Sequence, residues 1–265
     1  MDTKKDILSV QGMLPFLTQK EGAERIFVHQ TLESTNITAR ELVMKGAEHG
    51  TVVIADSQTG GKGRYGRSFF SPPGHGIYMS IALRQTAAWL ETSDLITPYT
   101  AVAVCEAIEA ICKKHPKIKW VNDIFLDEKK ICGILSQTIE GFGGVRWVII
   151  GIGINFSTPE SGFPEDLKEI AAAIYNGDMP HVTRNRLASE VLNRLTAMES
   201  RFDARHLLDE YRKRLNMLGK QVTVTGAGES FRAKAIDIDD MGHLVLLKNS
   251  GKTLLLSTGE ISIKI

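Results

Sequence analysis

The feature that most constrains this chain is a glycine-rich, cationic loop that lies between two apolar stretches. The loop covers residues 60–67 and reads Gly-Gly-Lys-Gly-Arg-Tyr-Gly-Arg. The flanking stretches, 51–55 and 76–83, are nearly all apolar, which predicts two buried strands. The loop is therefore expected to join two strands, and it does not open a helix as a P-loop would.

The composition of this loop suits an anionic ligand. Glycine permits backbone conformations that are closed to other residues and lets a ligand approach the main chain. Successive N–H groups in such turns form an anion-binding concavity. Lys62, Arg64 and Arg67 add positive charge. Considered alone, however, the loop is equally compatible with a plain hairpin whose charges are solvated.

Length and charge indicate a globular protein whose anion site is local. A chain of 265 residues exceeds the usual size of one domain and predicts a large domain with a small one. The 43% hydrophobic and 24% charged residues are ordinary for a soluble fold. Because 32 Lys+Arg balance 31 Asp+Glu, the formal net charge is +1, and no general attraction to nucleic acid or membrane is expected.

The chain shows neither a signal peptide nor an apolar run near the ~20 residues of a membrane span. Its three cysteines, Cys105, Cys112 and Cys132, include no CxxC pair, which argues against a disulfide framework or a zinc site. We therefore expect a cytoplasmic protein with no membrane association. Each cysteine is expected to be a small buried residue and not a nucleophile.

The spacing of apolar residues predicts an α+β fold, a mixed β-sheet with flanking helices. Helices are expected after an N-cap at Ser34 or Thr35 and over residues 97–115, 165–175, 183–202 and 204–215. Strands are expected at 25–28, 51–55, 76–83, 117–120, 124–126, 131–140 and 145–155. The last of these is almost continuously apolar, so we expect both of its faces to be covered.

The pattern of apolar residues and glycines in the sequence changes after Gly219. Short apolar stretches separated by glycines follow at 222–224, 231–238, 244–247, 254–256 and 261–263. Five short strands in so few residues predict a small SH3-like β-barrel. We accordingly expect a large domain over residues 1–218 and a C-terminal SH3-like domain over residues 219–265.

Five segments together resemble the biotin protein ligases, that is, the biotin–[acetyl-CoA-carboxylase] ligases. They are Ser-Thr-Asn at 34–36, the loop at 58–67, Lys-Trp-Val-Asn-Asp at 119–123, Lys-Ile-Cys-Gly-Ile-Leu at 130–135 and Gly-Ile-Gly-Ile-Asn at 151–155. They follow the order and the approximate spacing of that family, and the resemblance covers nearly the whole chain. It implies a class II synthetase-like catalytic domain of the biotin/lipoate ligase type, followed by an SH3-like domain.

The resemblance implies a two-step acyl transfer with biotin and ATP as substrates and Mg²⁺ as the metal. The carboxylate of biotin attacks the α-phosphate of ATP and gives biotinyl-5′-AMP and pyrophosphate. A lysine of a biotin carboxyl carrier protein then takes the biotin and releases AMP. Because a carboxylate and a triphosphate repel each other, fixed cations, backbone donors and a metal ion suit this chemistry.

The same resemblance assigns residues to the site. The implied catalytic residues are Lys119 and Arg64. The implied biotin-binding residues are Ser34, Thr35, Asn36, Gln58, Lys62, Gly63, Arg64, Lys119 and Gly133. The implied ATP- and phosphate-binding residues are Gly61, Lys62, Arg64, Arg67, Asn122, Asp123 and Asn155. No residue is assigned as a direct ligand of Mg²⁺, which the phosphates would hold.

Several of these residues also have structural explanations. A purely structural role would also explain each of three residues. Ser34 would then be a helix cap, Lys119 would be a solvated lysine at a strand end, and Asn122 would be part of a plain turn. Two positions depart from the family pattern, because Lys62 replaces an arginine and Val121 replaces a proline. Lysine keeps the charge but loses the bidentate fork of arginine, and valine is expected to loosen the turn. We expect activity to be retained.

Alternative functions remain open at this stage. A lipoate–protein ligase would use the same acyl-adenylate chemistry, and a non-catalytic module would only bind a nucleotide or an acylated carrier. A biotin-dependent repressor would bind DNA, but only 32 residues precede Glu33 and no basic domain is evident, so we expect no DNA binding. The sequence does not determine the acceptor carboxylase, and a homodimer is compatible with it.

Overall fold

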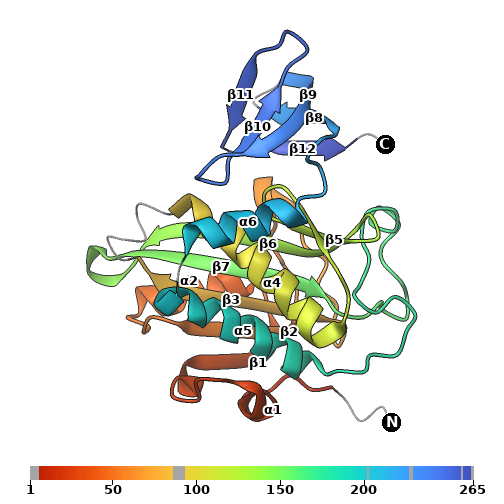
Figure 1. Ribbon diagram of the computed structural model, residues 1–265. Coiled ribbons are helices and arrows are strands. Elements are labelled where there is room, and N and C mark those ends of the chain that lie inside the picture. The colour runs from red at the N-terminus through yellow and green to blue at the C-terminus, as the bar shows by residue number, and fades with distance from the viewer. Residues whose placement is uncertain (1–5, 86–92, 202, 227–228, 258, 264–265) are drawn as a thin grey trace.

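The computed structural model contains a seven-stranded mixed sheet with helices and, at the C-terminal end, a five-stranded antiparallel sheet (Figure 1). It describes residues 6–85, 93–201, 203–226, 229–257 and 259–263. The large sheet has the order β1-β2-β3-β7-β6-β5-β4, in which β1 and β2 run parallel and the other neighbours antiparallel. Its strands are β1 (Ile26–Leu32), β2 (Thr51–Gln58), β3 (Gly76–Arg84), β4 (Lys117–Lys119), β5 (Asp123–Leu126), β6 (Lys129–Glu140) and β7 (Arg146–Asn155).

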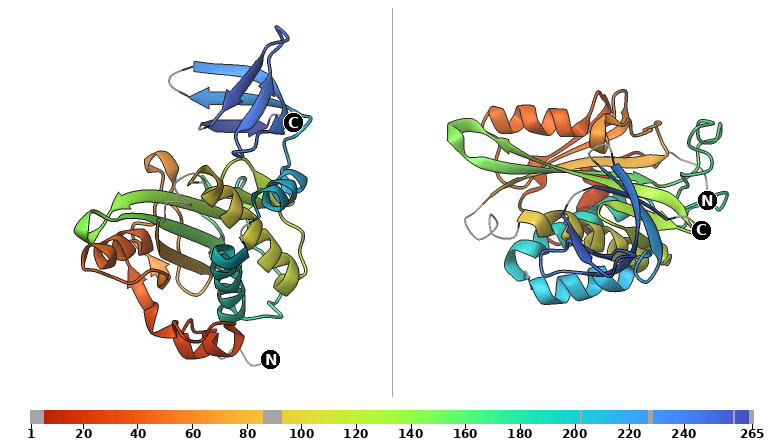
Figure 2. Two further views of the ribbon diagram at one scale, coloured as in Figure 1. Left: turned by 60° about the vertical axis from the view of Figure 1, so that its left-hand side comes forward. Right: turned by 90° about the horizontal axis from the view of Figure 1, so that it is seen from above.

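Helices lie on both faces of this sheet (Figure 2). Two long helices, α4 (Ile96–Cys112) and α5 (Arg184–Arg201), pack against each other on one face, and α6 (Ala204–Arg214) packs against α4. The other face carries α2 (Thr35–Met44), which packs on β2, β3 and β7. A short α1 (Val10–Met13) packs against α5.

Alternation of side chains along β7 explains why this strand is covered twice. Val148, Ile150 and Ile152 belong to the main core beneath α4 and α5. Trp147 and Ile149 belong to a second, smaller cluster beneath α2. The prediction that this strand is covered on both faces is therefore confirmed. Beyond Ile149, the α2 face of β7 continues with Gly151 and Gly153, which leave space above the strand.

The predicted helix over residues 165–175 is wrong. This segment belongs to the connection between β7 and α5, and its backbone pairs with strands of the sheet. Lys130 N donates to Ile170 O at 2.8 Å, Ala172 N donates to Lys130 O at 2.9 Å, and Ile174 N donates to Asn155 O at 3.0 Å. Backbone groups that bond to β6 cannot also form the i to i−4 bonds of a helix.

The remaining helices and strands lie where the sequence predicts them, with ends shifted by a few residues. Among them, β1 is longer than expected and runs to Leu32. The predicted end of the 183–202 helix, Phe202, lies outside the described residues.

The C-terminal sheet confirms the five predicted strands. They are β8 (Gln221–Gly226), β9 (Glu229–Ile238), β10 (Leu244–Leu247), β11 (Thr253–Leu256) and β12 (Glu260–Ile263), in the order β11-β10-β9-β8-β12. This sheet stands beyond α6 as a separate layer (Figure 1). Trp120 Nε1 donates to Gly242 O at 3.0 Å and so links the turn after β4 to this sheet. The boundary between residues 218 and 219 stays a prediction.

Among the residues that the structure describes, one helix is apolar enough to cross a membrane by length and composition alone, which was not expected from the sequence. It covers Ser93–Cys112, that is, α4 together with the short 3-10 helix that precedes it. Two thirds of the apolar window, 67%, is buried inside the fold, where α4 packs against α5 and β6. This burial is the property of a core helix in a soluble protein, so the composition of α4 is weak evidence for a membrane.

Candidate active site

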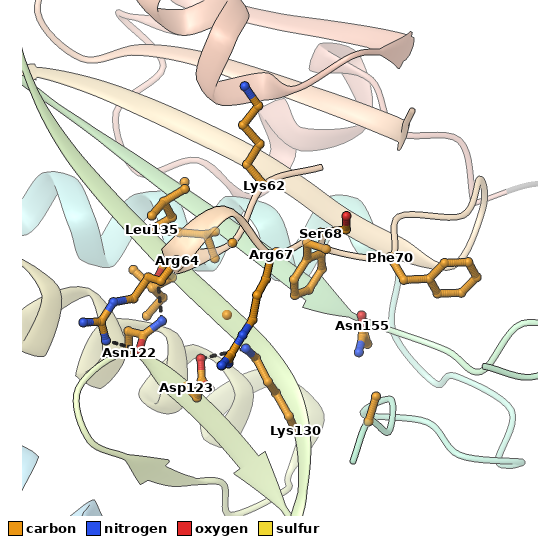
Figure 3. Close-up of a pocket in the computed structure, with 18 of the residues that line it drawn as sticks. Lys62, Arg64, Arg67, Ser68, Phe70, Asn122, Asp123, Lys130, Leu135 and Asn155 are labelled. Carbon is orange, nitrogen blue, oxygen red and sulfur yellow. Dashed lines mark hydrogen bonds and ion pairs between the residues drawn. The ribbon is translucent and has the colours of Figure 1, made fainter. Parts of the chain in front are cut away.

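A pocket of about 530 Å³ opens on the α2 face of the large sheet (Figure 3). Its walls come from the N-terminus of α2, the loop after β2, strands β5 to β7, and the connection that follows β7. All but one of the residues that the resemblance assigns line it: Ser34, Thr35, Asn36, Gln58, Lys62, Gly63, Arg64, Arg67, Lys119, Asn122, Asp123, Gly133 and Asn155. The structure therefore brings together segments that lie far apart in the sequence.

Gly61 is the exception, and packing explains why it is glycine. A Cβ at this position would lie 2.5 Å from Phe69 O and 2.8 Å from Ser71 Oγ. Phe69 N also donates to Gly61 O at 2.9 Å. Gly61 is buried at the base of the loop, where no side chain fits.

The N-terminus of α2 places three polar side chains at one end of the pocket. Ser34, Thr35 and Asn36 are buried, yet all three line the cavity. Ser34 occupies the N-cap position but makes no side-chain cap hydrogen bond. Instead, Gln58 Oε1 accepts from Thr35 N at 2.9 Å, so a residue of β2 satisfies this helix end. Capping by Ser34 therefore does not explain this segment.

The glycine-rich loop folds back on itself as a small hairpin over the pocket. Gly63 N donates to Arg67 O at 2.7 Å, and Lys62 forms an antiparallel bridge with Ser68. Tyr65 and Gly66 turn the chain with φ of 57° and 74°. Glycine adopts this left-handed conformation at no steric cost, which explains its presence at position 66.

A buried ion pair holds the base of this loop. Arg184 of α5 is 3% exposed, and its Nη1 lies 2.6 Å from Asp56 Oδ1 of β2. The same nitrogen donates to Gly76 O, where β3 begins, at 3.1 Å. Asp56 Oδ2 accepts from Gly74 N at 3.1 Å. The two ends of the loop are thus fastened to each other and to α5.

The cations of the pocket have distinct partners. Arg64 donates to Asn122 Oδ1 at 3.0 Å and to Gly259 O of the C-terminal sheet region at 3.4 Å. Figure 3 shows the Arg67 side chain extending toward Asp123 and Lys130, whereas Lys62 points away from them. The loop therefore directs two of its three cations toward the strands of the sheet.

Lys130 is a pocket residue that the sequence analysis did not assign. Its Nζ lies 2.7 Å from Asp123 Oδ1. A Cβ on Gly133 would approach Lys130 Cε and Nζ at 3.2 Å, so glycine at 133 leaves room for this side chain. Lys119, in contrast, places its Nζ 5.7 Å from the ring centroid of Phe125. The Lys-x-x-Gly spacing at 130–133 contained the signal for Lys130, because both residues belong to one motif.

Aromatic residues of the pocket were also missed. Phe69 lies over glycines of the central strands, since a Cβ at Gly153 would be 2.6 Å from its ring. Phe70 meets Phe163 of the connection after β7, with ring centroids 6.2 Å apart. A phenylalanine side chain carries no polar group, so only the fold identifies these residues as part of the pocket.

The three cysteines are free and buried, as expected. Burial raises the pKa of the Cys112 thiol to about 11 and raises the pKa values of Cys105 and Cys132 as well. Thiols held in the neutral form are poor nucleophiles.

The pocket also contains carboxylates, from Asp123, Glu128 and Glu169. Carboxylate oxygen is a ligand type that Mg²⁺ prefers. Among the described residues, however, no group of three or more His, Cys, Asp or Glu side chains is arranged to hold a metal. A Mg²⁺ ion in this pocket would therefore take most of its ligands from phosphates and water, with these carboxylates as the candidate protein ligands.

The fold and the pocket define a ligase of the biotin/lipoate class. Residues 28–155 match the Biotin/lipoate A/B protein ligase family, and residues 217–264 match the Biotin protein ligase C terminal domain. The bifunctional ligase/repressor BirA of Bacillus subtilis is 35% identical over 237 residues, which cover 86% of this chain and 71% of that protein. The chain therefore belongs to the biotin protein ligase family.

Two further comparisons agree with this membership. The biotin–[acetyl-CoA-carboxylase] ligase of Mycobacterium tuberculosis is 28% identical over 86% of this chain and 85% of its own length. The solved structure of the biotin protein ligase from Aquifex aeolicus in complex with biotin and ATP is 25% identical. It superposes with a TM-score of 0.75 and covers 90% of this chain and 98% of its own.

Proposed function

We propose that this chain activates biotin with ATP to biotinyl-5′-AMP and transfers the biotinyl group to a lysine of a biotin carboxyl carrier protein. One observation carries the proposal: a single pocket joins a buried polar end to a cationic end. Asn36 lies over Gly151 at the polar end, and Phe69 lies over Gly153 toward the cations. Gly151 and Gly153 are two residues apart in β7, about 7 Å along the strand, so one small acid lying along β7 can reach both ends.

The comparisons support the substrates. The relative from M. tuberculosis is a biotin–[acetyl-CoA-carboxylase] ligase, and the structure from A. aeolicus holds biotin and ATP. Both match this chain over most of its length. The family thereby supports an ATP-dependent ligase whose acceptor is the biotin carrier of a carboxylase.

The cationic end suits the first chemical step. The carboxylate of biotin and the α-phosphate of ATP are both anions, so contact between them costs electrostatic repulsion that fixed cations offset. We assign this task to Arg64, Arg67 and Lys130, which line the pocket from the loop and from β6. Lys130 joins Lys119 as a catalytic candidate. The position of Lys119 against Phe125 favours a secondary role for it. A Mg²⁺ ion bound to the phosphates would neutralise the departing pyrophosphate.

In the second step, the ε-amine of the acceptor lysine attacks the acyl carbon of biotinyl-AMP. The new amide bond forms, the bond to AMP breaks, and the amine loses its proton. A loop that covers the adenylate protects this mixed anhydride from water. The hairpin at residues 61–69, with Arg64 bonded to Asn122, is suited to this covering.

Lipoate is the less favoured acid. Ser34, Thr35 and Asn36 are buried at the polar end, and a dithiolane ring offers them no hydrogen-bond partner. Each hydrogen bond that the ligand fails to make at this end forgoes about 0.5–1.5 kcal/mol. A cyclic urea, as in biotin, has both donors and an acceptor. The absence of DNA binding, the homodimer and the cytoplasmic location remain predictions.

Mass spectrometry of a biotin carboxyl carrier domain tests the proposal after incubation with the purified chain, biotin and Mg-ATP. The expected product carries one biotinyl group on its acceptor lysine, and a carrier with that lysine replaced by arginine is the control. Biotin-dependent exchange of pyrophosphate into ATP tests the first step alone. Exchange that occurs with lipoate and not with biotin would overturn the assignment.

A further inference from the structure

Asn36 is held by two side chains from the sheet that the sequence analysis did not connect with the pocket. Its Oδ1 accepts from Ser80 Oγ at 2.6 Å, and Ser80 is fully buried in β3. Its Nδ2 donates to Gln137 Oε1 of β6 at 2.8 Å and to Leu135 O at 3.5 Å. Both ends of the Asn36 amide are thus fixed by two side chains, Ser80 and Gln137, that are not among the residues lining the pocket.

Strand register explains this arrangement. Gly151 of β7 pairs with Ser80 on one side and with Leu135 on the other, so the three residues form a row across the sheet. Asn36 lies directly over the middle of this row, because a Cβ at Gly151 would be 2.2 Å from Asn36 Oδ1. Glycine at 151 therefore admits the amide between its two partners.

The hydrogen-bond partners of Asn36 determine which end of its amide carries the oxygen and which carries the nitrogen. The oxygen and nitrogen ends of an asparagine amide have nearly the same size, and only their hydrogen bonds distinguish them. Leu135 O can only accept, which directs Nδ2 of Asn36 toward β6. The Ser80 hydroxyl must then donate to Oδ1 of Asn36.

A count of protons extends this constraint to the neighbouring residues. Ser80 Oγ also lies 2.7 Å from Thr35 Oγ1, but its hydroxyl has one proton. The hydroxyl of Thr35 also lies 3.2 Å from Gln58 Oε1. When Ser80 donates to Asn36, the single proton of Thr35 goes to Ser80 or to Gln58, and the lone pairs of Thr35 Oγ1 receive no proton from Ser80. Acceptor capacity then remains at Thr35 Oγ1, which lines the pocket beside Gln58.

We propose that Ser80 and Gln137 are positioning residues that set the hydrogen-bond polarity at this end of the pocket through Asn36 and Thr35. The end so arranged presents acceptors and selects an acid whose far end carries N–H donors, as the ring of a cyclic urea does. This inference rests on the proposed function, because it concerns how the same pocket recognises biotin. Neither residue touches the reacting carboxylate.

The test uses a pair of variants at position 137, which is exposed, so that a substitution there removes little buried surface. Gln137→Met removes the acceptor for Asn36 Nδ2, whereas Gln137→Glu keeps an acceptor and has no donor. Steady-state pyrophosphate exchange would give KM for biotin, KM for ATP and kcat. We expect Gln137→Met to raise KM for biotin about fivefold, the effect of one hydrogen bond. We expect kcat and KM for ATP to change less than about twofold, and Gln137→Glu to restore most of the biotin KM.

A second pair separates positioning from stability. Ser80→Ala is expected to raise KM for biotin about tenfold and to lower the preference for biotin over lipoate by a similar factor. Ser189→Ala is its control, because Ser189 is also fully buried and donates to the carbonyls of Met13 and Asn185. It should lower stability without changing either KM.

The outcomes distinguish the two proposals. Wild-type protein that shows no exchange with biotin would refute the proposed function itself. Active wild type with an unchanged biotin KM in Gln137→Met would refute the inference alone, as would a Gln137→Glu variant as impaired as Gln137→Met. Equal rises in the KM values for biotin and ATP would also refute it, since a general loosening of the pocket would then explain the data.

Discussion

Lys130 Nζ lies 2.7 Å from Asp123 Oδ1, and both residues line the pocket between strands β5 and β6. The side chains are 32% and 24% exposed, so the pair is only partly desolvated. In the absence of an anionic ligand, the carboxylate compensates the lysine. A carboxylate or phosphate that enters the pocket can compete with Asp123 for the ammonium group.

Lys130→Gln is therefore expected to lower kcat for biotin-dependent pyrophosphate exchange by about 100-fold or more, the size typical of losing one preorganised charge at a reacting centre. Lys119→Gln is the matched comparison and should lower kcat less than about tenfold, because Lys119 lies against Phe125. The reverse order of effects would restore Lys119 as the principal cation. Circular dichroism of both variants checks that the fold is retained.

The polar part of the site was predictable because its residues fall in recognisable local patterns. Ser34 to Asn36, the glycine-rich loop and the turn at Asn122 each combine unusual residue types at short spacing, and the fold gathers them in one pocket. Lys130 was not assigned, because its place in the Lys-x-x-Gly motif does not show how far its side chain reaches. That reach depends on the irregular pairing of β5 with β6 between Ile124 and Phe125, and on the missing side chain at Gly133.

The connection after β7 shows a different limit. Leu167, Ile170, Ala171 and Ile174 are spaced as on a helix, yet the backbone at Ile170 and Ala172 pairs with Lys130. Local periodicity cannot reveal a partner strand about forty residues earlier in the chain. The aromatic pair of Phe70 and Phe163 was missed for the same reason, since apolar residues far apart in sequence carry no signal of contact.

A second prediction concerns the space above β7 that the missing side chain of Gly153 leaves for Phe69. A Cβ at Gly153 would lie 2.6 Å from the ring of Phe69. Gly153→Ala should therefore displace Phe69 and raise KM for biotin or ATP about tenfold or more, with a loss of stability of about 1–3 kcal/mol from overpacking. Pyrophosphate exchange and urea unfolding measure the two effects. If Phe69→Leu in the same chain relieves the stability loss, the clash with the ring is its cause; no relief would contradict this explanation.

The closed loop predicts a kinetic effect at Arg64. This side chain connects the loop to Asn122 and to Gly259, so it closes the hairpin over the pocket. Arg64→Ala is expected to speed the release of biotinyl-AMP about tenfold or more, because hydrogen bonds from a charged group contribute about 1.5–3 kcal/mol. Rapid filtration of the pre-formed complex measures the release rate. Arg64→Lys keeps the charge but loses the fork and should give an intermediate rate. Unchanged release in Arg64→Ala would show that this residue does not hold the loop closed.

Stability at low pH should depend on Glu210 of α6. Hydrogen bonds from Lys213 and Arg214 lower the pKa of Glu210 from 4.5 to about 2. Since the pKa is lower in the folded state, this stabilisation is complete above pH 4.5 and is lost as the pH falls from 4.5 toward 2. Glu210→Gln should accordingly lower the free energy of unfolding at pH 7 by about 1–2 kcal/mol, reduced from the full linkage value because Lys213 is largely exposed.

The difference between Glu210→Gln and wild type should shrink as the pH falls through this range, and urea unfolding at several pH values measures it. Glu165 provides the control, because its side chain is 87% exposed and pairs with Lys168 three residues away. Glu165→Gln is expected to change the free energy of unfolding by less than about 0.5 kcal/mol. The charge explanation would be wrong if the stability deficit of Glu210→Gln stayed constant down to about pH 2.5, through the window that the lowered pKa defines. In that case packing of the side chain, and not its charge, would stabilise α6 against the rest of the fold.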